Sequence, residues 1–537
     1  MRKLLLLALS YCLSISLWAQ PNFSLQINPL DFNGLGGLQS FAWGKAEGKW
    51  LLIGGRTDGL HRRQPFASFD PAGNNTQLIV FDPATQQIWS NTLGDLPTAL
   101  QEQLSATNIE FFQENNHLFL VGGYGYSPTN GDHTTFPLLT RLSVSNVINA
   151  IINNQDIAPF FHYVEDDFFA VTGGQLEKLN DTFYLVGGQK FEGRYNPMGP
   201  DHGPGFFQEY TNAIRKFTLS FADNTLAASN LEEIKDTVNL HRRDYNMLPQ
   251  IFPNGTMGYT AFSGVFQYDA DVPFLNSVDI FADDYEVNND FAQFYNHYHC
   301  AKNAFFSTEA QEMYNLFYGG IAQYYDSLGV MIQDDEVPFV KTVACVSRDA
   351  QGVMKEYKMA VEMPDYIGAS AEFIPAENLP VFENGVIQYD LLPDTAFLGY
   401  IYGGIIPSSK NIFWNNEGDL SDAENRIFTV TLIKDSTTGF AQLNPQSIAD
   451  LRMQIFPNPA DRQLHVTFSL NYLDNLTFQL IDLRGNTVFE QKYSADQLKL
   501  GNNSFGYNLS EMDYGKVFIA TVFSQKDSIT QKLIINP

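Results

Sequence analysis

The stretch Leu118-Phe119-Leu120-Val121-Gly122-Gly123 decides the fold of this chain, because its pattern recurs. Clear copies of an apolar run that ends in a glycine pair stand at residues 51–55, 183–188, 316–320 and 400–404. A degraded copy, Ala261-Phe262-Ser263-Gly264, fills the gap between the third and fourth clear ones. One glycine pair marks any tight exit from a strand. Six copies in one chain indicate a repeated β unit.

The first copy shows what surrounds the glycines. A polar loop is followed by a strand at residues 77–81, an Asp82-Pro83 turn, and a further strand that contains Trp89. This order resembles the kelch family, although the later units are longer and lack the Trp. The resemblance implies four-stranded blades around a central channel. We therefore predict an all-β chain with a six-bladed kelch-like β-propeller over residues 22–445.

The two ends of this region suggest how the ring closes. The last unit has its own third strand near residues 426–433, and an unassigned strand at residues 23–27 precedes the first complete unit. We expect the N-terminal strand to complete the sixth blade.

The composition changes after Leu451. The segment opens with Phe456-Pro457-Asn458-Pro459, continues with Asp482-Leu483-Arg484-Gly485, and ends in the apolar strand 532–535. These motifs resemble the C-terminal sorting domain of the type IX secretion system. The resemblance implies that residues 451–537 form a small immunoglobulin-like β-sandwich, and that the secretion machinery is the partner of this domain. Any ligand or substrate would then be handled by the propeller.

The N-terminus indicates export. Arg2 and Lys3 precede an apolar run at residues 4–17, and Ala19 offers a cleavage point, so residues 1–19 are predicted to be a signal peptide. No later segment has the length of a membrane helix. We predict a secreted or outer-surface protein that passes through the periplasm. Only Cys300 and Cys345 remain after cleavage; they can pair or stay free, and we expect two buried free thiols.

Charge narrows the choice of partner. The sequence has 60 acidic and 32 basic side chains, a formal net charge of −28. Such a surface repels phosphate backbones and anionic lipid, so we expect neither nucleic-acid binding nor membrane insertion.

Long loops follow several glycine pairs, at residues 56–76, 189–210, 321–341 and 405–425. They are expected on one face of the propeller, where aromatic, amide and charged side chains suit a glycan. Segments 241–246 and 295–300 lead into the inner strands of blades four and five. The predicted ligand-binding residues are Arg194, Tyr195, His202, Arg242, Arg243, Asp244, Tyr245, His297 and His299. The alternative is that Arg and His at such positions only tie blades together.

Familiar catalytic motifs are missing. There is no G-x-S-x-G, H-E-x-x-H or Walker sequence, and His297 and His299 have no third metal ligand at matching spacing. We therefore expect no metal and no cofactor, and we assign no catalytic residue. The leading hypothesis is a binding propeller for a glycan or a surface protein. The alternatives are a carbohydrate-active enzyme (epimerase, lyase or hydrolase) on the same face, and a structural surface protein.

Overall fold

The structure is a computed structural model that describes residues 21–32, 34–64, 66–196, 205–327, 330–434, 453–456, 460, 463–470, 475–482, 487–499, 501–509, 517–523 and 528–535. The predicted signal peptide, residues 1–19, lies outside this range, as do His202 and residues 435–445. The chain divides into a large unit and a small C-terminal unit, with the boundary between Phe440 and Ala441. Each unit is described by itself.

Six main sheets, built mostly of antiparallel strands, make up the described part of the large unit and are numbered here 1 to 6 in chain order. Sheet 1 consists of β2 (Ala42–Ala46), β3 (Lys49–Ile53), β4 (Gln77–Asp82) and β5 (Gln87–Thr92). Sheet 2 consists of β6 (Glu110–Glu114), β7 (His117–Val121), β10 (Leu138–Ser143) and β11 (Phe161–Glu165). Sheet 3 consists of β12 (Gln175–Leu179), β13 (Thr182–Val186), β16 (Ala213–Ala222) and β17 (Thr225–Lys235).

The second half repeats this order. Sheet 4 consists of β18 (Asn246–Ile251), β19 (Met257–Phe262), β20 (Ser277–Ile280) and β21 (Tyr285–Asn288). Sheet 5 consists of β22 (Ala301–Ser307), β23 (Glu312–Tyr318), β26 (Thr342–Arg348) and β27 (Met354–Glu362), with β29 (Ile387–Gln388) added in parallel to β22. Sheet 6 consists of β28 (Ala371–Pro375), β30 (Thr395–Gly403), β33 (Ile427–Lys434) and β1 (Phe23–Pro29).

Smaller elements connect the sheets. Helix α1 (Thr98–Leu104) follows sheet 1, and α2 (Val144–Ile152) lies between β10 and β11. The loops add three small sheets of their own. These are β8 (Tyr124–Ser127), β9 (Asp132–Thr135), β14 (Gln189–Glu192) and β15 (Phe207–Tyr210); β24 (Tyr324–Ser327) and β25 (Val330–Gln333); and β31 (Ile405–Pro407) and β32 (Ser421–Ala423).

The repeated glycines allow neighbouring sheets to approach each other. Gly122 has a φ of 63°, and a Cβ at this position would lie 1.8 Å from the carbonyl O of Val171 in the segment that leads into sheet 3. Gly319 repeats the arrangement, with a Cβ position 1.9 Å from the carbonyl O of Ile367. No other residue avoids such a clash and also adopts this φ without strain. The motif is therefore required where one sheet hydrogen-bonds to the next.

A ring of hydrogen bonds connects the six sheets. One residue just ahead of the first strand of each sheet takes part, and this set is called the collar: Ser40, Asn108, Gly173, Asp244, His299 and Ser370. Five of the six links are backbone N–H···O bonds of 2.7–3.1 Å between successive members, including the link from Ser40 N back to Ser370 O. In the sixth link Thr172 Oγ1 donates to Asn108 O at 3.2 Å.

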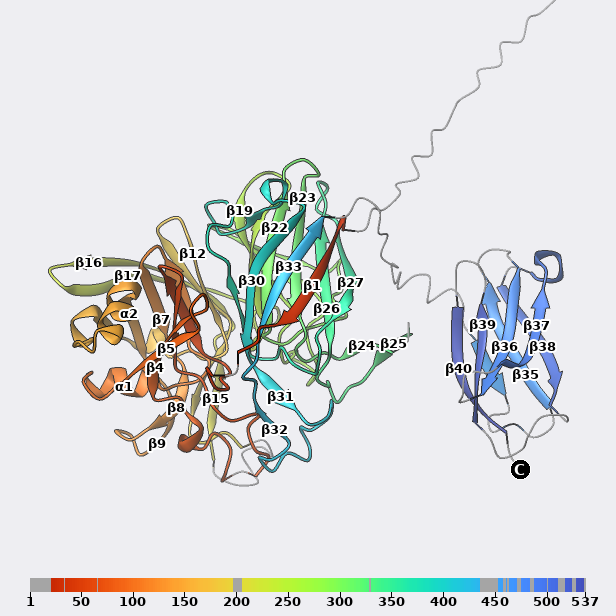
Figure 1. The fold of residues 1–537 in the computed structure, drawn as a ribbon, viewed down its shortest axis with the longest axis horizontal. Helices are drawn as coiled ribbons and strands as arrows, with labels where there is room; N and C mark the ends of the chain where they lie inside the picture. The colour runs from red at the N-terminus through yellow and green to blue at the C-terminus, as the bar shows by residue number, and fades with distance from the viewer. Residues whose placement is uncertain are drawn as a thin grey trace, which may run out of the picture. The chain divides into compact units, whose positions relative to one another are not determined.

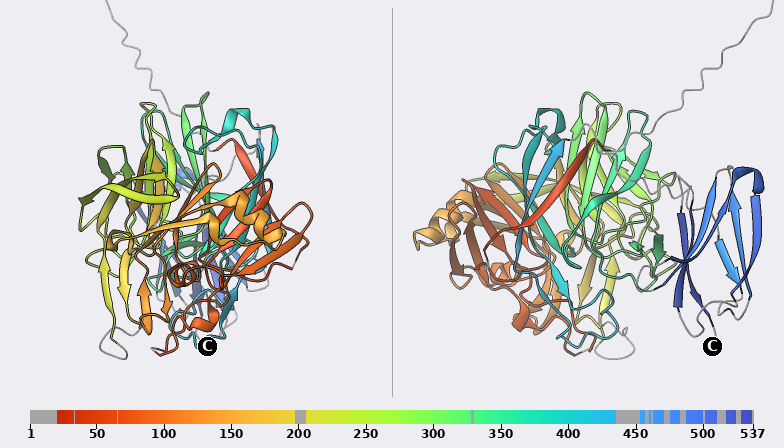
Figure 2. Two further views of the ribbon diagram at one scale, coloured as in Figure 1. Left: turned by 90° about the vertical axis from the view of Figure 1, so that its left-hand side faces the viewer. Right: turned by 45° about the vertical axis from the view of Figure 1, so that its right-hand side comes forward.

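The expectation that the N-terminal strand completes the last sheet is confirmed. Strand β1 runs antiparallel to β33, from Phe23 opposite Lys434 to Pro29 opposite Phe428. Figures 1 and 2 show red β1 lying along blue β33. The Phe23 side chain is fully buried and contacts Phe305 and Tyr314 of sheet 5, at ring-centroid distances of 5.9 and 5.5 Å.

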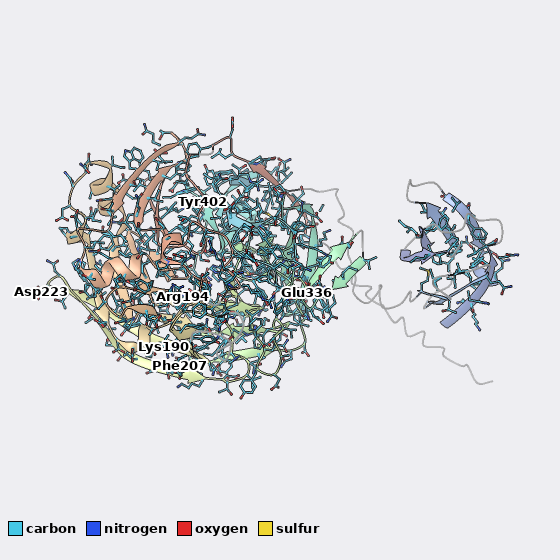
Figure 3. All side chains as sticks on the ribbon, turned by 90° about the horizontal axis from the view of Figure 1, so that it is seen from below. Lys190, Arg194, Phe207, Asp223, Glu336 and Tyr402 are labelled. Carbon is cyan, nitrogen blue, oxygen red and sulfur yellow. The ribbon has the colours of Figure 1, made fainter. Side chains whose placement is uncertain are left out.

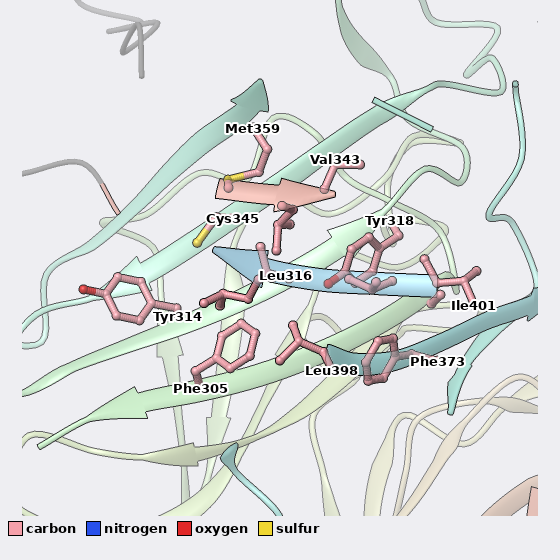
Figure 4. Packing of buried hydrophobic residues seen from close by; sticks show 14 of the residues in the cluster. Phe305, Tyr314, Leu316, Tyr318, Val343, Cys345, Met359, Phe373, Leu398 and Ile401 are labelled. Atoms are coloured by element: carbon pink, nitrogen blue, oxygen red, sulfur yellow. The ribbon is translucent and has the colours of Figure 1, made fainter. Parts of the chain in front are cut away.

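Sheets 5 and 6 share a large apolar core, part of which is drawn in Figure 4. Tyr318 and Phe373 stack across it with a centroid distance of 6.0 Å. Cys345 belongs to this core, and Cys300 to another core that joins sheets 4 and 5. Both thiols are buried and free, as expected.

The C-terminal unit is also all-β. One sheet consists of β34 (Met453–Phe456), β35 (Gln463–Leu470) and β38 (Gly501–Asn508). The other consists of β37 (Thr487–Tyr493), β36 (Leu476–Asp482), β39 (Val517–Phe523) and β40 (Ser528–Ile534). Val466, Phe478, Leu480 and Val522 belong to one core cluster shared by both sheets. The unit therefore has a hydrophobic core of its own.

Because β1 supplies the outer strand of sheet 6, Phe23→Ala should destabilise the whole large unit. We expect a loss of about 3–5 kcal/mol in the free energy of unfolding, as for other fully buried Phe side chains. Phe397→Ala is the control, because Phe397 lies in the same sheet but is 41% exposed, and its change should stay near about 0.5 kcal/mol. Urea unfolding followed by circular dichroism measures both. Equal effects of the two changes would contradict a closing role for β1.

Candidate functional site

The loops that follow the glycine pairs gather on one side of the large unit, called the loop face. The loops of sheets 1 and 6 meet at a bridge between Asp58 and Asp422, and those of sheets 2 and 3 at a pairing of Thr134 with Glu192. In Figure 1 the loop strands β8, β9, β15, β31 and β32 lie at the lower end of this unit. Figure 3 looks onto the unit from below, with Arg194 near its middle.

Exposed aromatic side chains concentrate on the loop face. Among the described residues, four aromatic side chains are more than half exposed: Phe66 (71%), Phe207 (52%), Tyr268 (60%) and Trp414 (58%). Each lies in the loop between the second and third strands of a different sheet, sheets 1, 3, 4 and 6 respectively. We call these four side chains the aromatic rim.

A polar cluster lies between these loops. Arg243 is at its centre: Nε donates to Tyr210 Oη at 3.0 Å, Nη1 donates to the Asp244 carboxylate, and the guanidinium covers the Phe266 ring at 5.3 Å. Its Nη2 makes no hydrogen bond with any residue that the structure describes. The set called the mouth cluster consists of Arg243, Asp244, Tyr210, Tyr195, His61 and Tyr298.

Three further rings complete the mouth cluster. His61 and Tyr195 meet edge to face at 5.0 Å, and Tyr195 is near enough to Arg243 for the guanidinium to oppose a rise in its pKa. Tyr298 Oη is buried and has no hydrogen-bond partner among the described side chains and backbone groups. The cluster therefore offers unused donors beside aromatic faces.

Burial and close partners determine which side chains of the mouth cluster are charged. Burial acts to lower the pKa of Arg243, but the Tyr210 and Asp244 oxygens outweigh it, and the pKa is raised above its ordinary value. Burial lowers the pKa of His61 to about 4, so its imidazole is neutral at physiological pH. Burial raises the pKa of Tyr298, whose phenol stays protonated and is a hydrogen-bond donor. The arrangement fits a ligand with hydroxyl or anionic oxygens.

Several predicted residues come together here. Tyr195, Arg243 and Asp244 belong to the mouth cluster, and Arg194 donates to the carbonyl O of Phe66 at the aromatic rim. His299 belongs to the collar, and its Nε2 lies 3.1 Å from Glu372 Oε1. His202 is outside the described residues.

Arg242, Tyr245 and His297 have a different environment. Arg242 is 1% exposed and donates to the carbonyl oxygens of Asn239, Ser263 and Asn276. Burial therefore removes these three side chains from the candidate site. The alternative of a tie between sheets fits Tyr245, whereas the partners of Arg242 and His297 belong to the sheet that each of them leads into.

The other two side chains are buried as well, Tyr245 against the preceding sheet and His297 against the sheet that it leads into. Tyr245 Oη donates to the carbonyl O of Val186 in sheet 3 at 2.8 Å. The fully buried His297 lies with Nδ1 2.5 Å from Gly319 O, against the Phe317 ring. His297 has a φ of 48°, so the strand alternation that would put it on one face with His299 does not apply.

A cavity of about 200 Å³ lies at the centre of the six sheets and is called the central cavity. Residues at the first strand of every sheet line it, and the collar members Asn108, Gly173 and His299 belong to its wall. Sequence reasoning missed its three glutamates, Glu110, Glu177 and Glu372. The available signal was a Glu within the first three residues of the first strand, which sheets 2, 3 and 6 share.

The different environments of the neighbours Arg242 and Arg243 predict different effects of substitution. Arg242→Gln should lower the free energy of unfolding by about 1–3 kcal/mol, because buried carbonyl groups lose their donors. Arg243→Gln should lower it by about 0.2–1 kcal/mol, since its ion pair is partly exposed. Urea unfolding of the two variants tests this difference. A larger loss for Arg243→Gln would reverse our assignment of the two roles.

Comparison with known proteins gives one assignment. Residues 454–536 match the family described as "Secretion system C-terminal sorting domain". No curated protein matches the chain. Neither described helix has the length and apolar character needed to cross a membrane.

Some solved structures show a weak likeness. A fungal alcohol oxidase of the AA5 family in complex with copper is 9% identical, with 96% of this chain and 99% of that chain covered and a TM-score of 0.35. YjhT is 10% identical, with 74% and 97% covered and a TM-score of 0.38. A protein from Lactobacillus plantarum is 9% identical, with 83% and 98% covered and a TM-score of 0.28. At these scores the likenesses carry no information about activity.

The sorting-domain match does carry a conclusion about location. The C-terminal segment is a type IX secretion sorting domain, and the chain is therefore delivered by that route to the cell surface or the extracellular space.

Proposed function

We propose that the large unit is a six-bladed kelch-like β-propeller that binds a glycan on its loop face. In this proposal the propeller covers residues 22–445, and residues 451–537 form an immunoglobulin-like sandwich that engages the type IX machinery. Six four-stranded units, the glycine pairs at their edges and the collar support the propeller. Predicted cleavage after Ala19 accounts for entry into the periplasm.

The observation that carries glycan binding is the pairing of the aromatic rim with the mouth cluster. A sugar ring presents apolar C–H faces and a fringe of hydroxyl groups, so it is bound by aromatic stacking together with directed hydrogen bonds. The rim supplies four exposed aromatic side chains from four loops. The mouth cluster supplies the Arg243 guanidinium and the Asp244 carboxylate between them.

The spread of these groups favours a ligand of several sugar units. Trp414 is covered by the Arg63 guanidinium at 5.1 Å, and Tyr268 contacts His241 edge to face at 5.6 Å. His241 in turn stacks on Tyr210 of the mouth cluster at 3.8 Å. Aromatic contacts thus lead from the mouth cluster out to Tyr268. An oligosaccharide can use the centre and part of the rim at once.

Glycan binding is tested with a glycan array, followed by calorimetry with the best-bound oligosaccharide. Arg243→Gln should weaken binding at least about tenfold, since a charge-assisted hydrogen bond contributes about 1.5–3 kcal/mol. Trp414→Ala should weaken it by a smaller factor. Arg141→Gln is the matched control, because Arg141 lies in strand β10 of sheet 2 and its guanidinium covers the Phe221 ring of sheet 3. Absence of saturable binding would refute the proposal, and turnover of the bound sugar would support the enzyme alternative.

The sorting domain should be separable from the propeller. A chain that ends at Asn444 is expected to fold with an unchanged urea transition of the large unit, because the C-terminal unit has a separate hydrophobic core. The truncated chain should accumulate in the periplasm, whereas the full chain reaches the surface or the medium. Cell fractionation and surface proteolysis measure the distribution. Equal surface delivery of both chains would contradict the assignment of the tail.

A further inference from the structure

The central cavity has chemistry of its own, separate from the mouth cluster. Carboxylates of Glu110, Glu177 and Glu372 line it, with Asn108, Gln175, His299 and Lys302. The acceptor-bearing residues Asn108, Glu110 and Glu177 come from sheets 2 and 3, and the basic side chains His299 and Lys302 come from sheet 5. Two of the three carboxyl groups therefore lie on the side of the cavity away from the basic side chains, and Glu372 of sheet 6 lies beside His299.

Glu110 is the most informative of these residues. Its side chain is 4% exposed, and Oε1 accepts a hydrogen bond from Gly174 N at 2.8 Å. Its Oε2 is buried and has no partner among the described residues, and the same holds for Asn108 Oδ1. A buried acceptor without a donor is costly in a folded protein. Two such oxygens on the wall of one cavity indicate that something positive or hydrogen-donating belongs there.

The charges are not balanced by the protein. Glu372 is matched by His299 at 3.1 Å and accepts a hydrogen bond from Trp43 Nε1 at 3.4 Å. Glu177 has no hydrogen bond or ion pair with any described residue, although Lys302 is near enough to oppose the rise in its pKa. Burial raises the pKa of Glu177 to about 8 and that of Glu110 well above its ordinary value. Both carboxyl groups thus lack the counter-charge that would keep them ionised.

We propose that the central cavity binds a divalent cation of the oxygen-preferring class, with Ca²⁺ as the best fit. Glu110 Oε2, Asn108 Oδ1 and the Glu177 carboxylate are its protein ligands. Carboxylate and amide oxygens are the ligands of Ca²⁺, which accepts six to eight of them in flexible geometry. Among the described side chains no three His, Cys, Asp or Glu residues form a preassembled metal site. Water must therefore supply the remaining ligands, and at about 30 Å³ each several waters fit in the cavity.

The cation would stabilise the collar as well as neutralise the carboxylates. Asn108 belongs to the collar, and Glu110 Oε1 is bonded to the backbone directly after collar residue Gly173. A cation held by Asn108, Glu110 and Glu177 therefore links the first strands of sheets 2 and 3. Binding should stabilise the folded state, because the ligands are brought together only there.

Calorimetric titration of the purified chain with CaCl₂, at about 0.15 M ionic strength, tests the proposal. One saturable site is expected, together with a rise in the unfolding temperature relative to the chain in EDTA. MgCl₂ serves as a second probe and should bind at least about tenfold more weakly, because Mg²⁺ needs near-octahedral geometry.

Two glutamates of strand β6 provide the matched variants. Glu110→Gln keeps the shape and the acceptor for Gly174 but removes the carboxylate that the cation would bind, so it should lose at least about tenfold in Ca²⁺ affinity. In EDTA the Glu110→Gln variant should be no less stable than the unchanged chain. If Glu110 had only a structural role, the variant would be less stable in EDTA as well. Glu114→Gln is the control, because Glu114 is 43% exposed and paired with Lys178.

Two results would overturn the cation site. No saturable binding of Ca²⁺ to the unchanged chain would leave ordered water as the occupant of the cavity. If Ca²⁺ bound with equal affinity to the unchanged chain and to Glu110→Gln, the heat of binding in the titration would come from surface carboxylates. These are abundant at a net charge of −28. Glycan binding at the mouth cluster is measured separately, so neither result depends on it.

Discussion

The collar is the constraint on which the rest of the large unit depends. Each sheet twists and packs against its neighbours through apolar faces, which fix spacing but allow sliding. The collar hydrogen bonds remove that freedom, because each first strand is held to the strands before and after it at one residue. Ser40, Asn108, Asp244 and Ser370 adopt positive φ values of 50–58° to make these bonds. Their backbone strain is compensated only when the whole ring of bonds is present.

The two candidate sites inherit their geometry from this ring. Asp244 is a collar residue and also pairs with Arg243, so the position of the mouth cluster is tied to the hydrogen bond between Asp244 N and Gly173 O. Asn108 is a collar residue and a wall residue of the central cavity. Loops of very different length can therefore surround a centre whose position hardly varies. In many proteins a rigid scaffold positions variable loops, and the loops form the recognition surface. The ring and the loop face correspond to these two parts.

Sequence reasoning found the repeated units, the closing strand, the sorting domain and part of the mouth cluster. These follow from local patterns: glycine pairs, alternating apolar residues and short motifs. It did not separate Arg242, which is buried, from Arg243, which lies in the mouth cluster, although the two are adjacent. The strand rule assigns alternate faces only to extended backbone, whereas Asp244 and His297 have positive φ. The buried glutamates were missed because their role depends on strands that are far apart in sequence.

The position of β1 has a consequence for the order of events during synthesis. Phe23 pairs with Lys434, so the first strand to leave the ribosome waits for a partner made about 400 residues later. Until then sheet 6 lacks its outer strand, and the core that Phe23 shares with sheets 5 and 6 is incomplete. The nascent chain consequently cannot complete the fold of the large unit early. The large unit reaches its full stability only in one late step. For a chain that is exported from the cell, this pairing postpones closure of the ring until nearly the whole large unit has been made.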